Sequence, residues 1–193
     1  MAAERGGYQL RGLRAADDAE VEAVVALNND AVPAVNAVTV DWLHELVRLA
    51  AHADVVVGAR SDELAGVVLV LPATAAYDSV LFGWFVERYE SFLYLGRIVV
   101  HPAHRRRGVG RLVYDTMEQR ARAAGRLVCE VNVEPPNVDS QAFHLDRGFV
   151  EVGRCTLPDK VCQMLAKELR LSAVRLSVAS VQVVSGVGRN IPD

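Results

Sequence analysis

The stretch FLYLGRIVVHPAHRRRGVGRLVYDTMEQRARAAG, from Phe92 to Gly125, decides the fold of this chain. Its first part, Phe92 to Val100, is rich in aromatic and β-branched residues and predicts a strand. His101-Pro102 ends that strand, because proline cannot donate a hydrogen bond to a sheet. An amphipathic helix follows, with apolar residues at helical spacing, and Gly125 stops it. The stretch therefore predicts a strand, a basic turn and a helix in direct succession.

The turn between the predicted strand and helix, Arg105 to Gly110, combines three arginines with two glycines. Gly108 and Gly110 allow the backbone to approach an anion closely. The start of the helix offers unpaired N–H groups at the positive end of its dipole. We therefore expect a site for a phosphate group. The turn has neither the Lys-Ser/Thr pair of a Walker A loop nor the glycine spacing of a dinucleotide-binding loop.

This stretch resembles motif A of the GNAT-type N-acetyltransferases, V-x-P-x-x-R/Q-x-x-G-x-G. The pattern is matched at Val100, Pro102, Arg105, Gly108 and Gly110. In that family the turn holds the pyrophosphate of acetyl-CoA, and backbone groups of the preceding strand pair with the pantetheine arm. The alternative interpretation is an ordinary strand-to-helix connection with a solvated basic surface.

A second stretch supports the same resemblance. Pro135-Pro136 ends a strand, Asn137 is a fair N-cap, and a helix is predicted from Val138 to Arg147. The family's motif B, N-x-x-A/S-x-x-F-Y-x-x-x-G-F, is matched at Asn137, Ser140, Phe143, Gly148 and Phe149. His144 stands where the tyrosine is usual. The resemblance covers residues 8 to 169 and extends to an uncharacterised bacterial subgroup of the family.

The resemblance implies acetyl-CoA as cosubstrate and no metal. Asn137 is included in the donor site as a contact to the pantetheine, with a role as helix cap alone as the alternative. The implied acetyl-CoA-binding residues are Ile98, Val99, Val100, Arg105, Arg106, Arg107, Gly108, Val109, Gly110, Arg111 and Asn137.

Acetylation of an amine requires that the amine lose a proton, and the departing thiolate benefits from gaining one. Glu130 is the first candidate for the base, since the strand predicted from Arg126 to Val133 places it on one face together with Asn132. A related acetyltransferase group uses a glutamate at the matching position. The alternative is a carboxylate satisfied by Arg126 or by backbone. Glu87 and Glu90 are further candidates if their segment folds inward.

His144 is the candidate for the acid. Neutral histidine retains one ring N–H that can donate a hydrogen bond. Three interpretations stay open: His144 protonates the thiolate, it only lines the thiol pocket, or its presence marks a weak or lost activity.

The remaining chain predicts further elements around this centre. The predicted fold is one α/β domain, residues 1–170, with a mixed, mostly antiparallel sheet of six or seven strands flanked by helices. The resemblance implies that the sheet is split at the central strand to admit acetyl-CoA. The segment Ala73 to Ser91 is long for a connection, so it is either a lid over the acceptor site or a surface excursion that packs its own aromatic residues. The other predicted elements are strands at Tyr8–Arg14, Asp54–Ala59, Leu64–Leu71, Phe149–Cys155 and Val161–Glu168, and helices capped by Asp17 and Thr39.

Composition narrows the function classes. The 193 residues carry a net charge of −3, which argues against a general nucleic-acid or membrane binder and makes the arginine cluster a local site. Three cysteines without C-x-x-C spacing favour a reducing cytoplasm. No pair of histidines has metal-ligand spacing. For residues 171–193 the sequence leaves open an added edge strand, an exchange into a homodimer, or disorder.

The predicted function is acetyl-CoA-dependent transfer of an acetyl group directly to a primary amine, on a small molecule in preference to a protein. The alternatives are a protein or peptide N-acetyltransferase and a non-catalytic, regulatory module that binds acetyl-CoA. Nucleic-acid binding through the arginine turn is a remote third.

Overall fold

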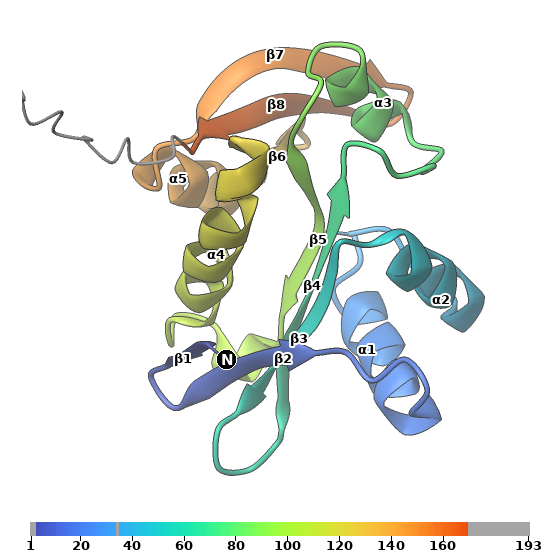
Figure 1. Ribbon diagram of the computed structural model, residues 1–193, viewed down its shortest axis with the longest axis vertical. Coiled ribbons are helices and arrows are strands. Elements are labelled where there is room, and N and C mark those ends of the chain that lie inside the picture. Colours follow the sequence, from blue (N-terminus) through green and yellow to red (C-terminus); the bar gives the residue numbers. More distant parts are fainter. Residues whose placement is uncertain (1–2, 34, 170–193) are drawn as a thin grey trace, which may run out of the picture.

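The computed structural model describes residues 3–33 and 35–169, which form an eight-stranded sheet in the order β1-β2-β3-β4-β5-β6-β8-β7 (Figure 1). Every neighbouring pair is antiparallel except β5 and β6. The strands are β1 (Ala3–Arg5), β2 (Tyr8–Gly12), β3 (His52–Gly58), β4 (Leu64–Pro72), β5 (Leu93–Val100), β6 (Arg126–Glu134), β7 (Val150–Leu157) and β8 (Lys160–Glu168). The predicted mixed, mostly antiparallel sheet is confirmed, and the count exceeds six or seven because Ala3–Arg5 adds a short edge strand.

Helices cover both faces of this sheet (Figure 1). Alternate residues of β4 show the division: Val68 and Val70 pack with α4, whereas Val67, Leu69 and Leu71 pack with α1, α2 and α3. The helices are α1 (Asp18–Asn29), α2 (Val40–Leu49), α3 (Val80–Val86), α4 (Val109–Arg120) and α5 (Val138–Asp146), with short 3-10 turns at η1 (Pro102–His104) and η2 (Ala121–Ala124).

The helix ends follow local sequence signals. Asp17 caps α1 by accepting a hydrogen bond from the Glu20 amide, and Thr39 caps α2 in the same way. The Glu20 carboxylate accepts a hydrogen bond from the Arg14 amide at 2.7 Å and pairs with Arg11 and Arg14. Gly125 ends the 3-10 turn after α4 with a φ of 76°, a conformation that glycine adopts without strain.

The sheet divides between β5 and β6. These parallel strands pair only at Leu93↔Leu127 and Tyr94↔Val128. Beyond them β5 continues along β4, and β6 continues along β8. The expected split at the central strand is therefore present, and it leaves the second half of β5 with one unpaired edge.

No helix among residues 3–33 and 35–169 is long and apolar enough to cross a membrane. The predictions for the tail, residues 171–193, lie outside the described residues.

Candidate active site

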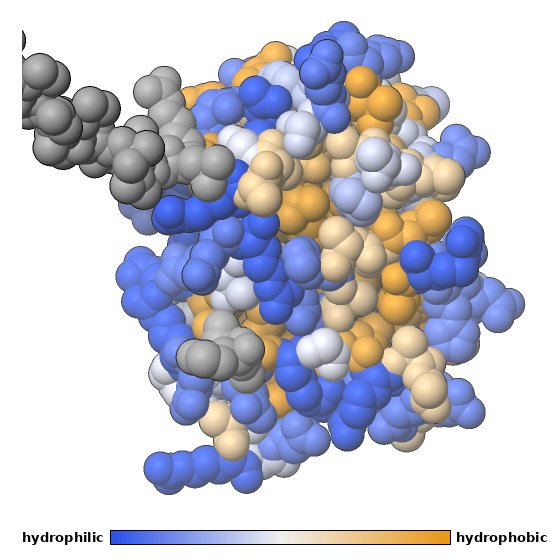
Figure 2. All heavy atoms as spheres, in the orientation of Figure 1, coloured by the Kyte–Doolittle hydropathy of each residue, from blue (hydrophilic) through white to orange (hydrophobic). Residues whose placement is uncertain are grey.

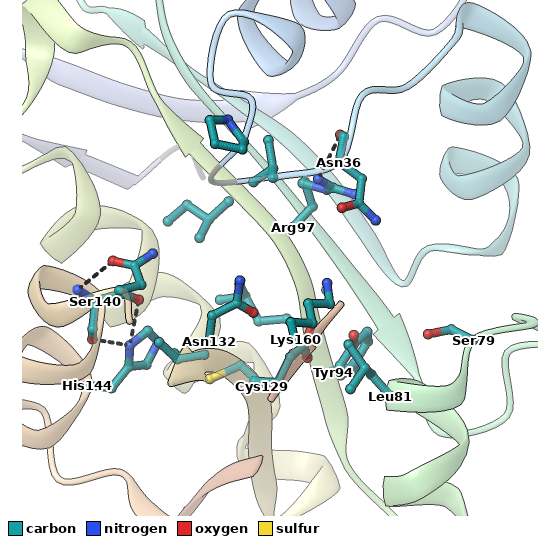
Figure 3. Close-up of a pocket in the computed structure, with 18 of the residues that line it drawn as sticks. Asn36, Ser79, Leu81, Tyr94, Arg97, Cys129, Asn132, Ser140, His144 and Lys160 are labelled. Atoms are coloured by element: carbon teal, nitrogen blue, oxygen red, sulfur yellow. Dashed lines mark hydrogen bonds between the residues drawn. The ribbon is translucent and has the colours of Figure 1, made fainter. Parts of the chain in front are cut away.

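A cavity of about 430 Å³ lies where β5 and β6 separate. Side chains from both strands reach it, because the missing strand pairing leaves space between them. Figure 2 shows apolar residues gathered in the middle of one face of the molecule, with hydrophilic residues around them. The cavity wall includes Pro33, Val35 and Asn36 before α2; Tyr77, Ser79 and Leu81 around the start of α3; Tyr94, Arg97 and Ile98 of β5; Tyr114 of α4; Cys129, Glu130 and Asn132 of β6; Asn137, Ser140 and His144 at α5; and Asp159 and Lys160 at the β7–β8 turn (Figure 3).

The free edge of β5 forms one side of the opening. Ile98, Val99 and Val100 pair with Val68, Val67 and Gly66 of β4 on one side and with no strand on the other. An exposed strand edge can pair with an extended ligand by adding hydrogen bonds along the backbone. The residues implied for the pantetheine arm therefore have a free edge.

The basic turn lies directly after β5. Gly108 precedes α4 with a φ of 89°, and a Cβ built there would meet nothing within 4 Å. No side chain caps the first amides of α4. Arg106, Arg107 and Arg111 are exposed and form no ion pair within the described residues. Open space, uncapped amides and unpaired cations together suit a diphosphate.

Gly110 has a different environment from Gly108. A Cβ at Gly110 would lie 3.6 Å from the Phe143 ring, an ordinary contact between α4 and α5. Arg105 also differs from its neighbours, because its Nε donates to the Val100 carbonyl oxygen at 3.3 Å. Arg105 therefore links the turn to the end of β5.

Glu130 places a carboxylate inside the cavity. Its Oε2 is buried and has no hydrogen-bond partner within the described residues. Burial raises the pKa of Glu130 to about 7, and favourable interactions with Tyr94, Lys160 and Arg97 offset only part of the rise. Arg126, the partner considered for a purely structural role, pairs instead with Glu168 at 2.5 Å. At neutral pH Glu130 is thus poised between its acid and base forms.

The alternative carboxylates lie elsewhere. Glu87 and Glu90 are exposed and do not line the cavity, and Glu87 pairs with Arg88 at 3.1 Å. The segment Ala73 to Ser91, which carries both glutamates, contributes to the cavity and to the core. Tyr77, Ser79 and Leu81 line the cavity, whereas the buried phenylalanines of the segment pack into the core.

His144 is buried, and both ring nitrogens are engaged. Nδ1 lies 2.7 Å from the carbonyl oxygen of Ser140, and Nε2 lies 2.5 Å from the hydroxyl of Tyr114. Because a carbonyl can only accept, Nδ1 carries the hydrogen and Nε2 accepts the phenolic proton of Tyr114. Burial lowers the pKa of His144 and raises that of Tyr114 well above its usual value, so both groups favour their neutral forms.

Asn137 is a helix cap, and its contact to the pantetheine stays a prediction. Its side-chain oxygen accepts from the Ser140 amide at 3.2 Å and so caps α5, and the residue also lines the cavity.

The two faces of the sheet contribute different groups. Val128 and Tyr94 pack with α1, α2 and α3, and Glu130 follows Val128 at the strand period of two. Tyr114 packs with the opposite face, together with Cys129 of β6. The cavity therefore joins a carboxylate on one face to a phenol–imidazole pair on the other through the split.

Two residues of this site carried no sequence signal. Tyr114 sits in the apolar stripe of α4, and nothing in its spacing indicates a bond to a residue 30 positions away. Arg97 lies within the strand pattern of β5, and its significance depends on which groups surround it.

A sequence model of the acetyltransferase (GNAT) family matches residues 21–149, more than half of the chain. The chain belongs to this family. A search of curated proteins finds no match. This GNAT chain is an acetyltransferase.

Solved structures share its fold at low identity. Ard1 from Thermoplasma volcanium has a TM-score of 0.66 and 14% identity, over 84% of this chain and 98% of that one. The yncA protein from Salmonella typhimurium, solved with its cofactor acetyl-CoA, has a TM-score of 0.59 and 20% identity over 84% and 94%. The ribosomal-protein-S18-alanine N-acetyltransferase from Escherichia coli has a TM-score of 0.61 and 14% identity over 88% and 98%.

Proposed function

We propose that this enzyme transfers the acetyl group of acetyl-CoA directly to the primary amine of a small molecule. The observation that carries this proposal is Glu130, whose unpartnered carboxylate oxygen is buried in a cavity beside the free edge of β5. A carboxylate with a pKa of about 7 is suited to accept a proton at neutral pH.

The proposed position of acetyl-CoA rests on two neighbouring features, the basic turn before α4 and the unpaired edge of β5. Exposed arginines and the uncapped start of α4 suit the diphosphate, and the edge at Ile98, Val99 and Val100 suits the pantetheine arm. A backbone amide of that edge would polarise the thioester carbonyl. Asn137, which also lines the cavity, is proposed to contact the arm as well.

Glu130 acts as the base in this proposal. As the amine nitrogen forms its bond to the acetyl carbon, Glu130 accepts the amine proton, directly or through one water. The bond between that carbon and sulfur then breaks, and the sulfur keeps the electron pair. Thiolate is a good leaving group, so a proton donor assists without being essential.

The Tyr114–His144 pair supplies that proton. Neutral His144 has no free N–H, because its Nδ1 hydrogen is donated to Ser140. The proton that can be released is the phenolic one of Tyr114: in the resting pair it is donated to His144 Nε2, and the hydroxyl can rotate to direct it at the sulfur, whereas the Nδ1 hydrogen is fixed in the plane of the ring. This modifies the sequence-based proposal that His144 is the acid: it becomes a positioning residue for Tyr114.

A small acceptor is favoured over a protein by the cavity wall. The α1–α2 connection, the start of α3 and the β7–β8 turn all contribute to it, so the acceptor side is bounded by three segments. A protein or peptide substrate remains the second candidate, and cytoplasmic location and a homodimer stay predictions.

The proposal is tested by measuring thiol release from acetyl-CoA against polyamines, amino acids, aminoglycosides and peptides. We expect turnover with at least one small amine and its loss in Glu130→Gln. Binding of acetyl-CoA without turnover on any acceptor would instead indicate a regulatory module.

A further inference from the structure

Arg97 is a cation on the acceptor side of the cavity without a matching anion. It lies on β5 and lines the cavity (Figure 3). Its Nη1 donates to the Asn36 carbonyl oxygen at 3.4 Å, a long hydrogen bond, and its guanidinium lies 5.2 Å from the Trp42 ring centre. Its Nε is buried and has no hydrogen-bond partner within the described residues.

A buried charge without a partner is unfavourable, and proteins normally pair it or bind an ion with it. Arg97 forms no ion pair within residues 3–33 and 35–169. Packing over Trp42 explains where the guanidinium lies, but it leaves the Nε hydrogen without an acceptor. Arginine stays protonated, so this cation persists in the cavity.

Glu130 is the complementary group. It faces the same cavity, and its charge acts on Arg97, yet the two side chains form no ion pair. Each keeps a buried polar atom without a partner: Oε2 of Glu130 and Nε of Arg97. The cavity wall therefore carries a carboxylate and a guanidinium of opposite charge that do not pair with each other.

We infer that the acceptor substrate is an amino carboxylate, such as a free amino acid, whose amine lies at Glu130 and whose carboxylate pairs with Arg97. The planar guanidinium suits a carboxylate, since it offers parallel N–H donors. This inference rests on the proposed function and adds the substrate class. It also separates the roles of the two residues: Glu130 acts on the reacting amine, and Arg97 binds the far end of the same molecule.

The test compares matched acceptors in the thiol-release assay with acetyl-CoA. Each free α-, β- or γ-amino acid is paired with its carboxamide and with the amine that lacks the carboxylate. We expect the free acid to have the highest kcat/KM of its set. In Arg97→Met the KM for the acid should rise about 10- to 100-fold, with KM for the carboxamide unchanged. Arg97→Lys keeps the charge but lacks the planar guanidinium, so its KM for the acid should lie between the values of the wild type and of Arg97→Met.

Arg88→Met is the matched control. Arg88 also lies over a tryptophan, 4.0 Å from the Trp84 ring centre, but it is exposed, pairs with Glu87 and does not line the cavity. We expect this variant to keep the wild-type preference. Equal kcat/KM for acid and carboxamide in the wild type, equal effects of Arg97→Met on both, or activity confined to peptides would each overturn the inference.

Binding of the acceptor without turnover separates this inference from the proposed function. Thermal shift and calorimetric titration of the enzyme with each acid and carboxamide measure binding alone. Tighter binding of the acid that Arg97→Met removes would support the inference even if no acetyl transfer were found. Acetyl transfer to plain amines together with equal binding of acid and carboxamide would overturn it and leave the proposed function intact.

Discussion

At the residue scale, we expect the protonation of Glu130 to control the rate. Burial raises its pKa to about 7, and only the ionised form can accept a proton from the amine. We expect kcat/KM to rise with pH up to about 7 and then to level off. Glu130→Gln should lower kcat about 100-fold and remove this limb, with acetyl-CoA affinity preserved. A loss below about threefold, or an unchanged limb, would assign the base to another group.

The same carboxylate has a predictable effect on stability. Its pKa is higher in the folded than in the unfolded protein, so folding favours the protonated form. That contribution is complete below the unfolded value of 4.5 and is lost as the pH rises through about 7. We expect Glu130→Gln to increase the free energy of unfolding at pH 8 by on the order of 2 kcal/mol and to change it little at pH 4.

Denaturant unfolding at both pH values measures this difference. Glu134→Gln is the control, because Glu134 ends the same strand but is exposed. An equal effect of the two substitutions at pH 8 would show that Glu130 is not the source. A gain in stability together with a loss of rate would indicate that the buried carboxylate is retained for function.

The bond between Tyr114 and His144 predicts coupled effects on the rate. If the phenol releases the proton and the imidazole holds it in place, removing either partner disables the same unit. We expect Tyr114→Phe and His144→Phe each to lower kcat about 10-fold, and the double variant to be no slower than either one. Single-turnover rates on all four proteins complete the cycle. Multiplied effects in the double variant, or a wild-type rate in Tyr114→Phe, would contradict the pair.

The sequence predicted Glu130 as a site residue, but it did not predict the partner of His144 or the role of Arg97. Alternation along one strand sufficed to place Glu130 on a face with Asn132, because strand period is a local property. The partner of His144 depends on how α4 packs on α5, which no local pattern specifies. Arg97 becomes a candidate site residue only because its Nε has no hydrogen-bond partner within the described residues, and a missing partner can be found only from the three-dimensional structure.

At the element scale, the turn after β5 depends on a backbone conformation that favours glycine. Gly108 has a φ of 89° and open space around its Cα, so a side chain there would project into the proposed phosphate site. We expect acetyl-CoA to raise the melting temperature of the wild type by several degrees and Gly108→Asp to abolish this shift.

Gly125→Asp is the matched control for backbone strain. Gly125 has a φ of 76° and equally open surroundings, but it lies at the other end of α4, beyond the 3-10 turn. Both variants should lose intrinsic stability, and only Gly108→Asp should lose the response to acetyl-CoA. An equal response in the two variants would remove the turn from the binding site.

Elements whose signals are local were predicted well. Asp17, Thr39 and Gly125 mark helix ends in the sequence and in the structure, because caps and left-handed glycines act within a few residues. The edge strand β1 was missed, since its three residues form a strand only by pairing with β2.

At the scale of the whole molecule, the eight-stranded sheet consists of two parts that are joined at two residue pairs. Strands β1 to β5 and strands β6 to β8 are each continuous, and only Leu93–Leu127 and Tyr94–Val128 join them directly. A ligand lying between β5 and β6 would contact both parts. A ligand that has the phosphates but no pantetheine arm would contact only the turn and α4.

Hydrogen exchange can separate these two modes of contact. With acetyl-CoA we expect slower exchange both in the turn, at the amides of Arg106 to Gly110, and along the free edge of β5, at Ile98 to Val100. With ADP, which has a diphosphate but no pantetheine arm, we expect protection in the turn alone. The reason is that an amide exchanges slowly when it is hydrogen-bonded, and only the arm can supply acceptors along that edge. Both ligands are compared at the same multiple of their dissociation constants, so that mass action stabilises the fold equally. Protection of β5 by ADP to the same extent would mean that the edge is closed by a rearrangement of the protein and not by the arm.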